Sequence, residues 1–426
     1  MNSRPSPENL TRETPEFSPD LLLQPIALPC GVRLANRLVK AAMTERLSGR
    51  DYAPNALHEA LYRRWADGGT GLLITGNMLV NAKYMESAGN IAPLVGDQRA
   101  ALTRMAEAAK SGGGQVWVQL NHAGRQTSRL NNFRPVSASD VGLKKLGFFS
   151  QPRPMREDEI QALIRDFVRC AALLRDCGFD GIQVHAAHGY LLSQFLSPIT
   201  NRRTDAWGGS LANRARLLLD VVRAVRGACG PAFPISVKIN SADFQRGGFD
   251  EDDSLTVIGW LEQEGLDLLE ISGGNYEKLV FFTQERDSTR ARESYFGAFA
   301  RQVKQATKLP VLLTGGFRTR GGCHAALADG DADLVGLARP FLCQPDFGRR
   351  FLSEIPGEWP LVHVPTLSLG SRKLDDLAEA GFWDAQVDRI ARGLAPDLAM
   401  GGWASISHLL QREVGKAMTK QLAGAA

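Results

Sequence analysis

Three side chains that can exchange protons stand close together in the sequence. His185, His188 and Tyr190 fall within six residues, where the apolar run GIQVHAA (181–187) gives way to polar residues. Two imidazoles three positions apart can hold one substrate oxygen, and a phenol two positions further can supply a proton beside it. Proton-carrying groups gathered at the carboxyl end of a strand are typical of an active site.

A metal site is the alternative for the two histidines. The helical motif H-E-x-x-H brings two ligands onto one helix face, but His185 and His188 stand at a predicted strand–loop junction and lack the glutamate. We therefore expect no metal here. The cysteines form no C-x-x-C pair, so we expect reduced thiols and neither a zinc site nor an iron–sulfur cluster. They are Cys30, Cys170, Cys177, Cys229, Cys323 and Cys343.

The composition excludes several classes of protein. With 426 residues, of which 44% are hydrophobic, the chain can bury a large core. The net charge is +4 and the charges are interspersed, without the basic stripe of a nucleic-acid-binding protein. No apolar run approaches the roughly 20 residues of a membrane helix, and the first residues lack the apolar core of a secretory signal. We expect a cytoplasmic protein whose partner is a small molecule, not a nucleic acid or a membrane.

Eight short apolar runs alternate with amphipathic stretches. Each run is nearly continuously apolar, as a parallel strand buried on both faces should be. Between them lie helical patterns, such as 156–179, where Ile160, Leu163, Ile164 and Phe167 recur at helical spacing. The runs are 37–43, 71–77, 115–121, 181–187, 234–240, 267–273, 310–316 and 333–339.

This alternation predicts an α/β protein with the fold of a (β/α)8 TIM barrel. A doubly wound open sheet is the alternative. It would bind its nucleotide on a G-x-G-x-x-G turn after the first strand, and the segment KAAMTERLSG contains no such turn. The candidate site residues all follow apolar runs, and the carboxyl ends of the strands are where barrel enzymes carry their active sites.

We expect three parts in the chain. Residues 1–20 are rich in Pro, Ser and Glu, which predicts a disordered segment. Residues 21–358 form the barrel, and residues 359–426 form a helical C-terminal extension in which 375–395 and 405–424 read as helices. Three roles are open to this extension: it wraps the barrel, contacts another copy of the chain in a homo-oligomer, or shapes the pocket. We favour wrapping.

Glycines and arginines follow the seventh and eighth runs. The segment GGFRTRGG (315–322) contains Gly315, Gly316 and Arg318, and VGLARPFL (335–342) contains Ala338 and Arg339. Glycines let backbone N–H groups approach a ligand, and guanidinium groups suit phosphate. Many barrels bind phosphate after strands 7 and 8, so these residues alone also fit a sugar-phosphate substrate.

The stretch from Val184 to Arg214 resembles the old yellow enzyme family of flavin-dependent ene-reductases, also called the NADH:flavin oxidoreductase family. Its pattern H-x-x-H-G-Y-L-x-x-Q-F-L-S-P, followed by N-x-R-x-D-x-W-G-G-S-x-x-N-R, is nearly complete here. The resemblance runs from about Leu21 to about Ile355. Trp207 and Arg214 belong to the pattern, and we expect them to brace the loop rather than to react.

The resemblance implies that the barrel, residues 21–358, binds FMN. The first strand would end against the flavin ring, with Thr44 tuning its potential, and Gly76 would leave room for the ring. Gln119 would hold the pyrimidine edge of the flavin, and Lys238 would stand near N1 and O2. The cofactor-binding residues implied are Ala41, Ala42, Met43, Thr44, Gly76, Gln119, Lys238, Gly315, Gly316, Arg318, Ala338 and Arg339.

The chain departs from the family pattern at two of these positions. Ala42 stands where proline is usual, and Lys238 stands where arginine is usual. Lysine keeps the positive charge but loses the bidentate fork of arginine. Alternatively, Lys238 is a buried lysine paired with a carboxylate such as Glu270. We favour the flavin role, because a lysine inside a barrel strand is costly without one.

The resemblance also implies a reaction. His185 and His188 would bind the carbonyl or nitro oxygen of an activated alkene, FMN would deliver hydride from N5, and Tyr190 would protonate the other carbon. NADH or NADPH would reduce the flavin first, in a ping-pong mechanism. Arg46 is a further candidate for substrate binding. Two alternatives are a flavin-free phosphate-binding synthase or isomerase, and a barrel that only binds a ligand.

Overall fold

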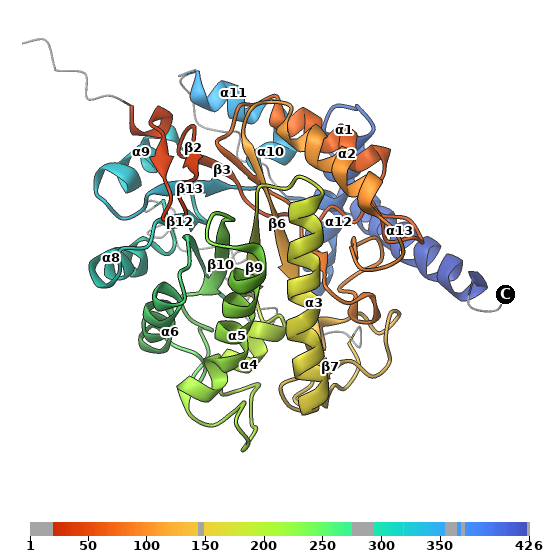
Figure 1. Ribbon diagram of the computed structural model, residues 1–426. Coiled ribbons are helices and arrows are strands. Elements are labelled where there is room, and N and C mark those ends of the chain that lie inside the picture. The colour runs from red at the N-terminus through yellow and green to blue at the C-terminus, as the bar shows by residue number, and fades with distance from the viewer. Residues whose placement is uncertain are drawn as a thin grey trace, which may run out of the picture.

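A closed ring of eight parallel strands forms the centre of the protein (Figure 1). The computed structural model describes residues 20–143, 149–274, 293–317, 319–353, 364–367 and 371–423, with the backbone alone for 372 and 413–423. The eight strands are β3 (Leu38–Lys40), β4 (Leu72–Ile74), β6 (Gln115–Asn121), β9 (Gly181–Ala186), β10 (Ile235–Asn240), β11 (Leu268–Ser272), β12 (Val311–Thr314) and β13 (Leu334–Leu337). Each pairs with the next, β13 pairs with β3, and β4 pairs with β6, which closes the ring. The predicted barrel is confirmed and the open-sheet alternative is wrong.

Helices follow the strands and surround the ring (Figure 1). Their apolar stripes face the strands, as Ile160, Leu163 and Phe167 of α3 do. The helix α5 begins at the side-chain cap of Ser210 and ends at Gly230, whose φ of +83° suits glycine. The helices are α1 (Ala56–Ala66), α2 (Arg99–Lys110), α3 (Glu157–Asp176), α4 (Leu191–Leu196), α5 (Leu211–Cys229), α6 (Glu251–Gln263), α8 (Gly297–Ala306), α9 (Arg320–Ala328), α10 (Pro340–Cys343) and α11 (Phe347–Leu352).

The amino-terminal end of the barrel is closed by a short hairpin. Leu28 and Leu34 of the hairpin pack with inward residues of the ring, including Val39, Leu72 and Leu334, in one buried apolar cluster. The opposite end is therefore the one that can bind a ligand. The hairpin is β1 (Ile26–Ala27) with β2 (Arg33–Leu34), and the other short elements are η1 (Leu21–Leu23), β5 (Met78–Leu79), η2 (Ala82–Tyr84), η3 (Gly124–Gln126), β7 (Val136–Ser137) and β8 (Arg153–Pro154).

The inward side chains divide the barrel into a polar half and an apolar half. Side chains alternate along each strand, so residues two apart face the same side. On β3, β4, β12 and β13 the inward residues are mainly apolar, and they pack on Trp117. On the adjoining strands β6, β9, β10 and β11 the inward residues toward the carboxyl ends are buried and polar. These are Gln119, Asn121, Gln183, His185, Ser236, Lys238, Asn240, Glu270 and Ser272.

Two long helices follow the barrel, as predicted. They are α12 (Arg372–Ala391) and α13 (Gly402–Ala423), which pack on each other and appear in blue in Figure 1. The helix α12 also contacts α1 and α10. This packing against two barrel helices agrees with the wrapping role. The predicted disordered segment lies outside the described residues except for Asp20, and so does the predicted boundary at 358–359.

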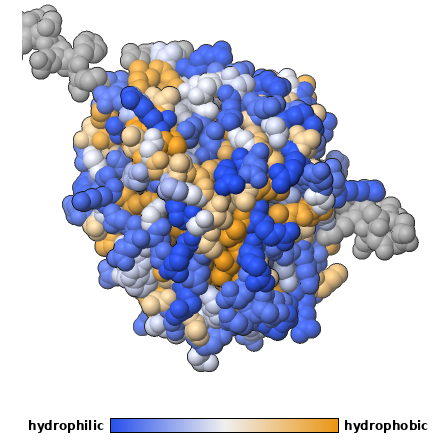
Figure 2. Space-filling model, in the orientation of Figure 1, coloured by the Kyte–Doolittle hydropathy of each residue, from blue (hydrophilic) through white to orange (hydrophobic). Residues whose placement is uncertain are grey.

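Hydrophilic residues cover most of the face seen in Figure 2, with apolar residues in smaller groups. Within the part of the chain that the structure describes, no helix is both long and apolar enough to cross a membrane. The location of the protein in the cell stays a prediction.

We predict that a side chain at Gly181, at the start of β9, destabilises the barrel. A Cβ there would stand 2.9 Å from the buried indole of Trp117. Overpacking of this kind costs about 1–3 kcal/mol, so Gly181→Val should lower the free energy of unfolding by that amount. Gly227→Ala on the exposed face of α5 meets no atom within 4 Å. It should raise stability by about 0.5–1 kcal/mol. Urea denaturation measures both, and a fully stable Gly181→Val variant would contradict the packing described.

Candidate active site

The fold brings the three predicted catalytic side chains together. His185 stands on β9, and His188 and Tyr190 lie in the turn between β9 and α4. The ring centroids of His185 and His188 are 5.0 Å apart, and those of His185 and Tyr190 are 4.8 Å apart, both in edge-to-face geometry. His185 and Tyr190 are 3% and 5% exposed, so both rings are largely shielded from bulk water.

A backbone contact determines which nitrogen of His185 carries the proton. The N–H of Ala187 donates to Nδ1 of His185 at 3.2 Å, so Nδ1 must be an acceptor. Burial, and then the neighbouring His188 and Lys238, lower the pKa of His185 well below its ordinary value. The imidazole is therefore neutral and carries its proton on Nε2, which makes Nε2–H a hydrogen-bond donor.

His188 is held in an unusual backbone conformation. Its φ is +61°, in the left-handed region that few residues other than glycine adopt. Its N–H donates to Oδ1 of Asn240 at 3.1 Å, and its carbonyl accepts from Nε2 of Gln126 at 2.7 Å. Its ring Nε2 lies 2.8 Å from Oγ of Ser272. The sequence analysis missed Asn240 and Ser272. Asn240 stands two residues after Lys238 on β10, and Ser272 stands two residues after Glu270 on β11, so each shares the inward face of its strand.

The hydroxyl of Tyr190 contacts a carboxylate that the sequence analysis also missed. It donates to Oε1 of Glu86 at 2.6 Å, and Nδ2 of Asn77 donates to Oε2 of the same carboxylate at 2.7 Å. Asn90 in turn donates to Asn77 at 2.8 Å. Glu86 lies in the loop after β5, more than 100 residues before Tyr190. No sequence motif marks it, so only the fold could reveal this pairing.

Lys238 takes part in a buried polar network inside the barrel. Its ammonium group lies 2.8 Å from Oε1 of Glu270, and both side chains are almost fully buried. Gln183 donates to Glu270 at 2.7 Å and accepts from Gln119 at 2.8 Å, while Thr314 donates to Glu270 at 2.9 Å. The pairing with Glu270 that we considered as the alternative is thus present. The flavin role of Lys238 stays a prediction, because one ammonium group can contact both a carboxylate and a ligand.

A second set of buried charges, absent from the sequence analysis, lies behind the predicted flavin residues. Glu45 accepts hydrogen bonds from the N–H of Gly76, at 2.7 Å, and from the hydroxyl of Tyr62. Lys40 is fully buried over the indole of Trp65, 4.4 Å from its centroid. Burial raises the pKa of Glu45 and lowers that of Lys40 to about 8. The Glu45 carboxylate thus links the segment after β3 to Gly76 after β4, and both segments contain predicted flavin contacts.

Gly76 illustrates how this packing constrains the strand ends. A Cβ at Gly76 would collide with the Glu45 carboxylate and with the main-chain oxygen of Met43. A glycine is therefore required by the protein itself, whether or not a ring also approaches. Ala41 is buried and its N–H donates to the carbonyl of Leu337 at 2.8 Å. Ala42, Met43 and Thr44 follow it and stay partly exposed.

The predicted phosphate-binding segments lie at the ends of β12 and β13. Gly315 and Gly316 have φ values of +112° and +87°, a conformation that suits glycine, and both are partly exposed. Ala338 is half-buried, and Arg339 is exposed with its guanidinium 3.8 Å from Glu379 of α12. Arg318 lies outside the described residues.

The C-terminal helices are tied to the loop after β3. The carboxylate of Asp384, on α12, lies 3.1 Å from Arg412 and 3.2 Å from His408, both on α13, and 3.8 Å from Arg46. Arg412 also donates to the main-chain oxygen of Arg46, whose φ is +57°. Burial alone would raise the pKa of Asp384, but His408 and the two arginines lower it. The substrate contact of Arg46 stays a prediction, since its guanidinium faces Asp384.

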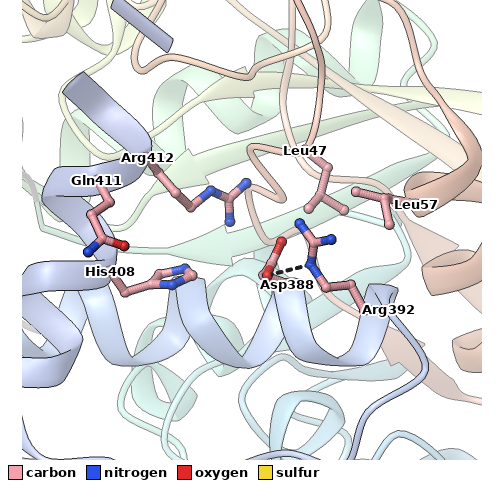
Figure 3. Close-up of a pocket in the computed structure, with 7 residues that line it drawn as sticks. All are labelled: Leu47, Leu57, Asp388, Arg392, His408, Gln411 and Arg412. Carbon is pink, nitrogen blue, oxygen red and sulfur yellow. Dashed lines mark hydrogen bonds and ion pairs between the residues drawn. The ribbon is translucent and has the colours of Figure 1, made fainter. Parts of the chain in front are cut away.

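A cavity of about 290 Å³ lies beside this cluster. Figure 3 shows His408, Gln411 and Arg412 facing Leu47 and Leu57 across it. Arg392 also lines the cavity and is paired with Asp388 at 2.8 Å, so part of the positive charge is neutralised. The cavity is lined by the C-terminal helices, α1 and the loop after β3, and none of the predicted catalytic residues contributes to it.

The carboxyl-terminal rim of the barrel fits the polar ring of FMN by its chemistry. Both amide atoms of Asn121 are buried and lack a hydrogen-bond partner among the described residues. Buried amides normally have partners, so this position suits a ligand with donors and acceptors. Gln119 on the same face, the hydroxyl of Thr44 and the ammonium of Lys238 add donors suited to such a ring. The main chain of Gly315 and Gly316, which no side chain covers, would hold the phosphate.

Comparison with known proteins identifies the family. The family described as NADH:flavin oxidoreductase / NADH oxidase matches residues 21–358. The chain belongs to this family. It is thus a flavin oxidoreductase that uses FMN, with NADH or NADPH as reductant. The resemblance to old yellow enzymes is confirmed, and the flavin-free synthase and the binding-only barrel are wrong.

Three relatives illustrate the match. The chain described here is 37% identical over 372 residues to the NADH-dependent flavin oxidoreductase nadA of Aspergillus parasiticus, and the match covers 82% of each chain. It is 30% identical over 331 residues to an NADPH dehydrogenase of Bacillus velezensis, covering 77% of this chain and 94% of that one. It superposes on the old yellow enzyme homologue from Zymomonas mobilis with a TM-score of 0.68 and 26% identity, over 79% and 93% of the chains.

We predict that Lys238 has separable effects on stability and on cofactor binding. Lys238→Met leaves the Glu270 carboxylate buried without its cation, so the apoprotein should lose about 3–5 kcal/mol of unfolding free energy. Adding Glu270→Gln should recover much of this loss, because the neutral amide needs no cation, its oxygen can still accept from Gln183, and its NH2 group can donate to the hydroxyl of Thr314. Urea denaturation measures stability. Titration of the apo double variant with FMN then isolates what the Lys238 cation adds, and parental affinity would show that Lys238 does not contact the cofactor.

We also predict that stability falls as the medium becomes acidic. Burial lowers the pKa of His122 to about 3, and it lowers the pKa values of His185 and His188 well below 6.5. The unfolded chain binds these protons below about pH 6.5 while the folded protein does not. Each histidine should therefore cost about 1.4 kcal/mol per pH unit below that value. Urea denaturation from pH 7.5 to 5 should show this slope. His122→Gln should remove one histidine's share, and an unchanged slope would contradict the neutral His122.

Proposed function

We propose that this enzyme reduces the C=C bond of activated alkenes such as enones, with Tyr190 as the proton donor. The observation that carries the proposal is the contact between the rings of His185, His188 and Tyr190, with His185 fixed as an Nε2–H donor. A neutral donor and a phenol side by side suit a carbonyl substrate that needs a hydrogen bond at oxygen and a proton at carbon.

The histidines would bind the activating oxygen of the substrate. His185 would donate from Nε2, and His188, held by Asn240 and Ser272, would donate beside it. These hydrogen bonds withdraw electron density from the β-carbon of the alkene, which makes that carbon a better hydride acceptor. Because both rings are buried and neutral, the donors stay in place without attracting counter-ions.

FMN, when bound, supplies the hydride chemistry, taking two electrons from NAD(P)H and passing them to the alkene. Gln119 and Asn121 would hold its polar ring edge, and Lys238 would offset negative charge there. Gly315 and Gly316 would hold its phosphate. Since nicotinamide and alkene would use the same site in turn, the mechanism would be ping-pong.

We predict that Tyr190→Phe separates the two half-reactions. Reduction by NAD(P)H needs no proton from the phenol, so its rate should stay close to that of the parent. Reoxidation by an enone should slow by about 10²-fold or more, the usual contribution of a general acid. Rapid-mixing absorbance measurements give both rates. If the variant reoxidises with an enone as fast as the parent, another group or water supplies the proton.

Histidine variants provide the matched comparison. His185→Ala or His188→Ala should weaken enone binding as well as slow the reaction, because each removes a donor to the substrate oxygen. Tyr190→Phe should leave enone binding almost unchanged. The dependence of the reoxidation rate on enone concentration separates affinity from rate. If only Tyr190→Phe lost affinity for the enone, Tyr190 and not the histidines would be the residue that binds the substrate oxygen.

A further inference from the structure

Tyr190 must regain a proton after each turnover, and its surroundings restrict how. The phenol ring is 5% exposed and packs with Leu79, Met85 and Ala123 in an apolar cluster. Bulk water therefore has little direct access to the hydroxyl. Glu86, whose Oε1 accepts from this hydroxyl at 2.6 Å, is partly exposed to solvent.

We propose that Glu86 is the relay that returns a proton from solvent to Tyr190, an inference that rests on the proposed role of Tyr190 as proton donor. Glu86 is a carboxylate, so it can bind a proton and release it again. It contacts the phenolic oxygen on one side and reaches water on the other. Its second oxygen is fixed by Asn77, which Asn90 orients in turn, so the carboxylate is held in place.

The proton balance is simple. The O–H bond of Tyr190 breaks as its proton bonds to the substrate carbon, leaving a phenolate. A phenolate and a carboxylate in hydrogen-bond contact repel each other, so the pair takes up one proton. That proton enters from water at Glu86, and an O–H bond then forms on the phenolate as the carboxyl group releases it. Glu86 ends each cycle as it began.

The neighbouring histidines are less suited to this task. His185 uses Nδ1 to accept from Ala187, and its remaining Nε2–H serves the substrate oxygen. The Nε2 of His188 is engaged with Ser272. Burial lowers the pKa values of both rings, so neither readily takes a proton from solvent. Glu86 combines contact with the phenol and partial exposure.

The test compares the first turnover with continuous turnover. Reduced Glu86→Ala enzyme, mixed with 2-cyclohexen-1-one, still holds the proton on Tyr190 and should reoxidise near the parental rate. Steady-state turnover with NADH and the same enone needs repeated reloading and should fall on the order of 10²-fold. Added formate, which fits the space left by the side chain, should restore turnover. Glu86→Gln fills that space and should be slow without rescue.

Two variants control for local disturbance. Glu86→Asp keeps a carboxylate and should retain much of the turnover. Lys83→Ala changes an exposed residue of the same segment that has no hydrogen bond to Glu86, Asn77 or Asn90, and it should behave like the parent. Full steady-state turnover in Glu86→Ala and Glu86→Gln without added acid would overturn the relay. So would a first turnover slowed as much as the steady state, because that result indicates a structural role.

The two proposals fail in different ways. If Tyr190→Phe reoxidises at the parental rate, Tyr190 is not the proton donor, and the proposed return of a proton to it through Glu86 is wrong as well. If Tyr190→Phe is slow while Glu86→Ala turns over normally, the donor stands and the relay is wrong. When both hold, adding Glu86→Ala to Tyr190→Phe should cause no further loss.

Discussion

The closed ring of parallel strands is the constraint on which the rest of this protein depends. Because every strand of the ring runs in the same direction, all eight carboxyl ends meet at one rim. The β1–β2 hairpin fills the opposite end with apolar side chains, so only this rim can receive a ligand. Residues far apart in the chain, such as Gln119, His185 and Lys238, become neighbours for this reason alone.

The polar half of the barrel interior imposes an energetic requirement. Buried charges and amides are costly unless they are paired, and here Lys238, Glu270, Gln183 and Gln119 satisfy one another in a continuous network. The Glu45–Tyr62–Gly76 contacts satisfy a second set behind the strand ends. At the rim, both amide atoms of Asn121 are left without a hydrogen-bond partner among the described residues. Partners within the protein thus position Gln119, Lys238 and Gly76, three of the proposed cofactor contacts.

The C-terminal helices, which follow the segment that matches the family, make further contacts with the barrel. Asp384 joins α12 and α13 to Arg46, and Glu379 lies beside Arg339. Arg46 follows β3 and Arg339 follows β13, which are neighbours in the ring. One pair of helices therefore touches the segments that follow two adjacent strands of the barrel. A left-handed backbone at Arg46 is held by a hydrogen bond from Arg412, so the shape of that loop depends on residues more than 360 positions away.

The sequence by itself determined the strands, the barrel fold and the grouping of three candidate residues at the carboxyl end of β9. Continuous apolar runs are local signals, and the spacing of His185, His188 and Tyr190 within one segment is local too. The tertiary structure alone decided the partners of these residues. Glu86, Asp384 and the Lys40–Glu45–Tyr62 cluster come from distant segments, and no periodicity links them to the site. Whether Lys238 pairs with Glu270 also depended on strand register. The sequence pattern leaves the register open because strands buried on both faces are apolar throughout, without the alternation that would distinguish one register from the next.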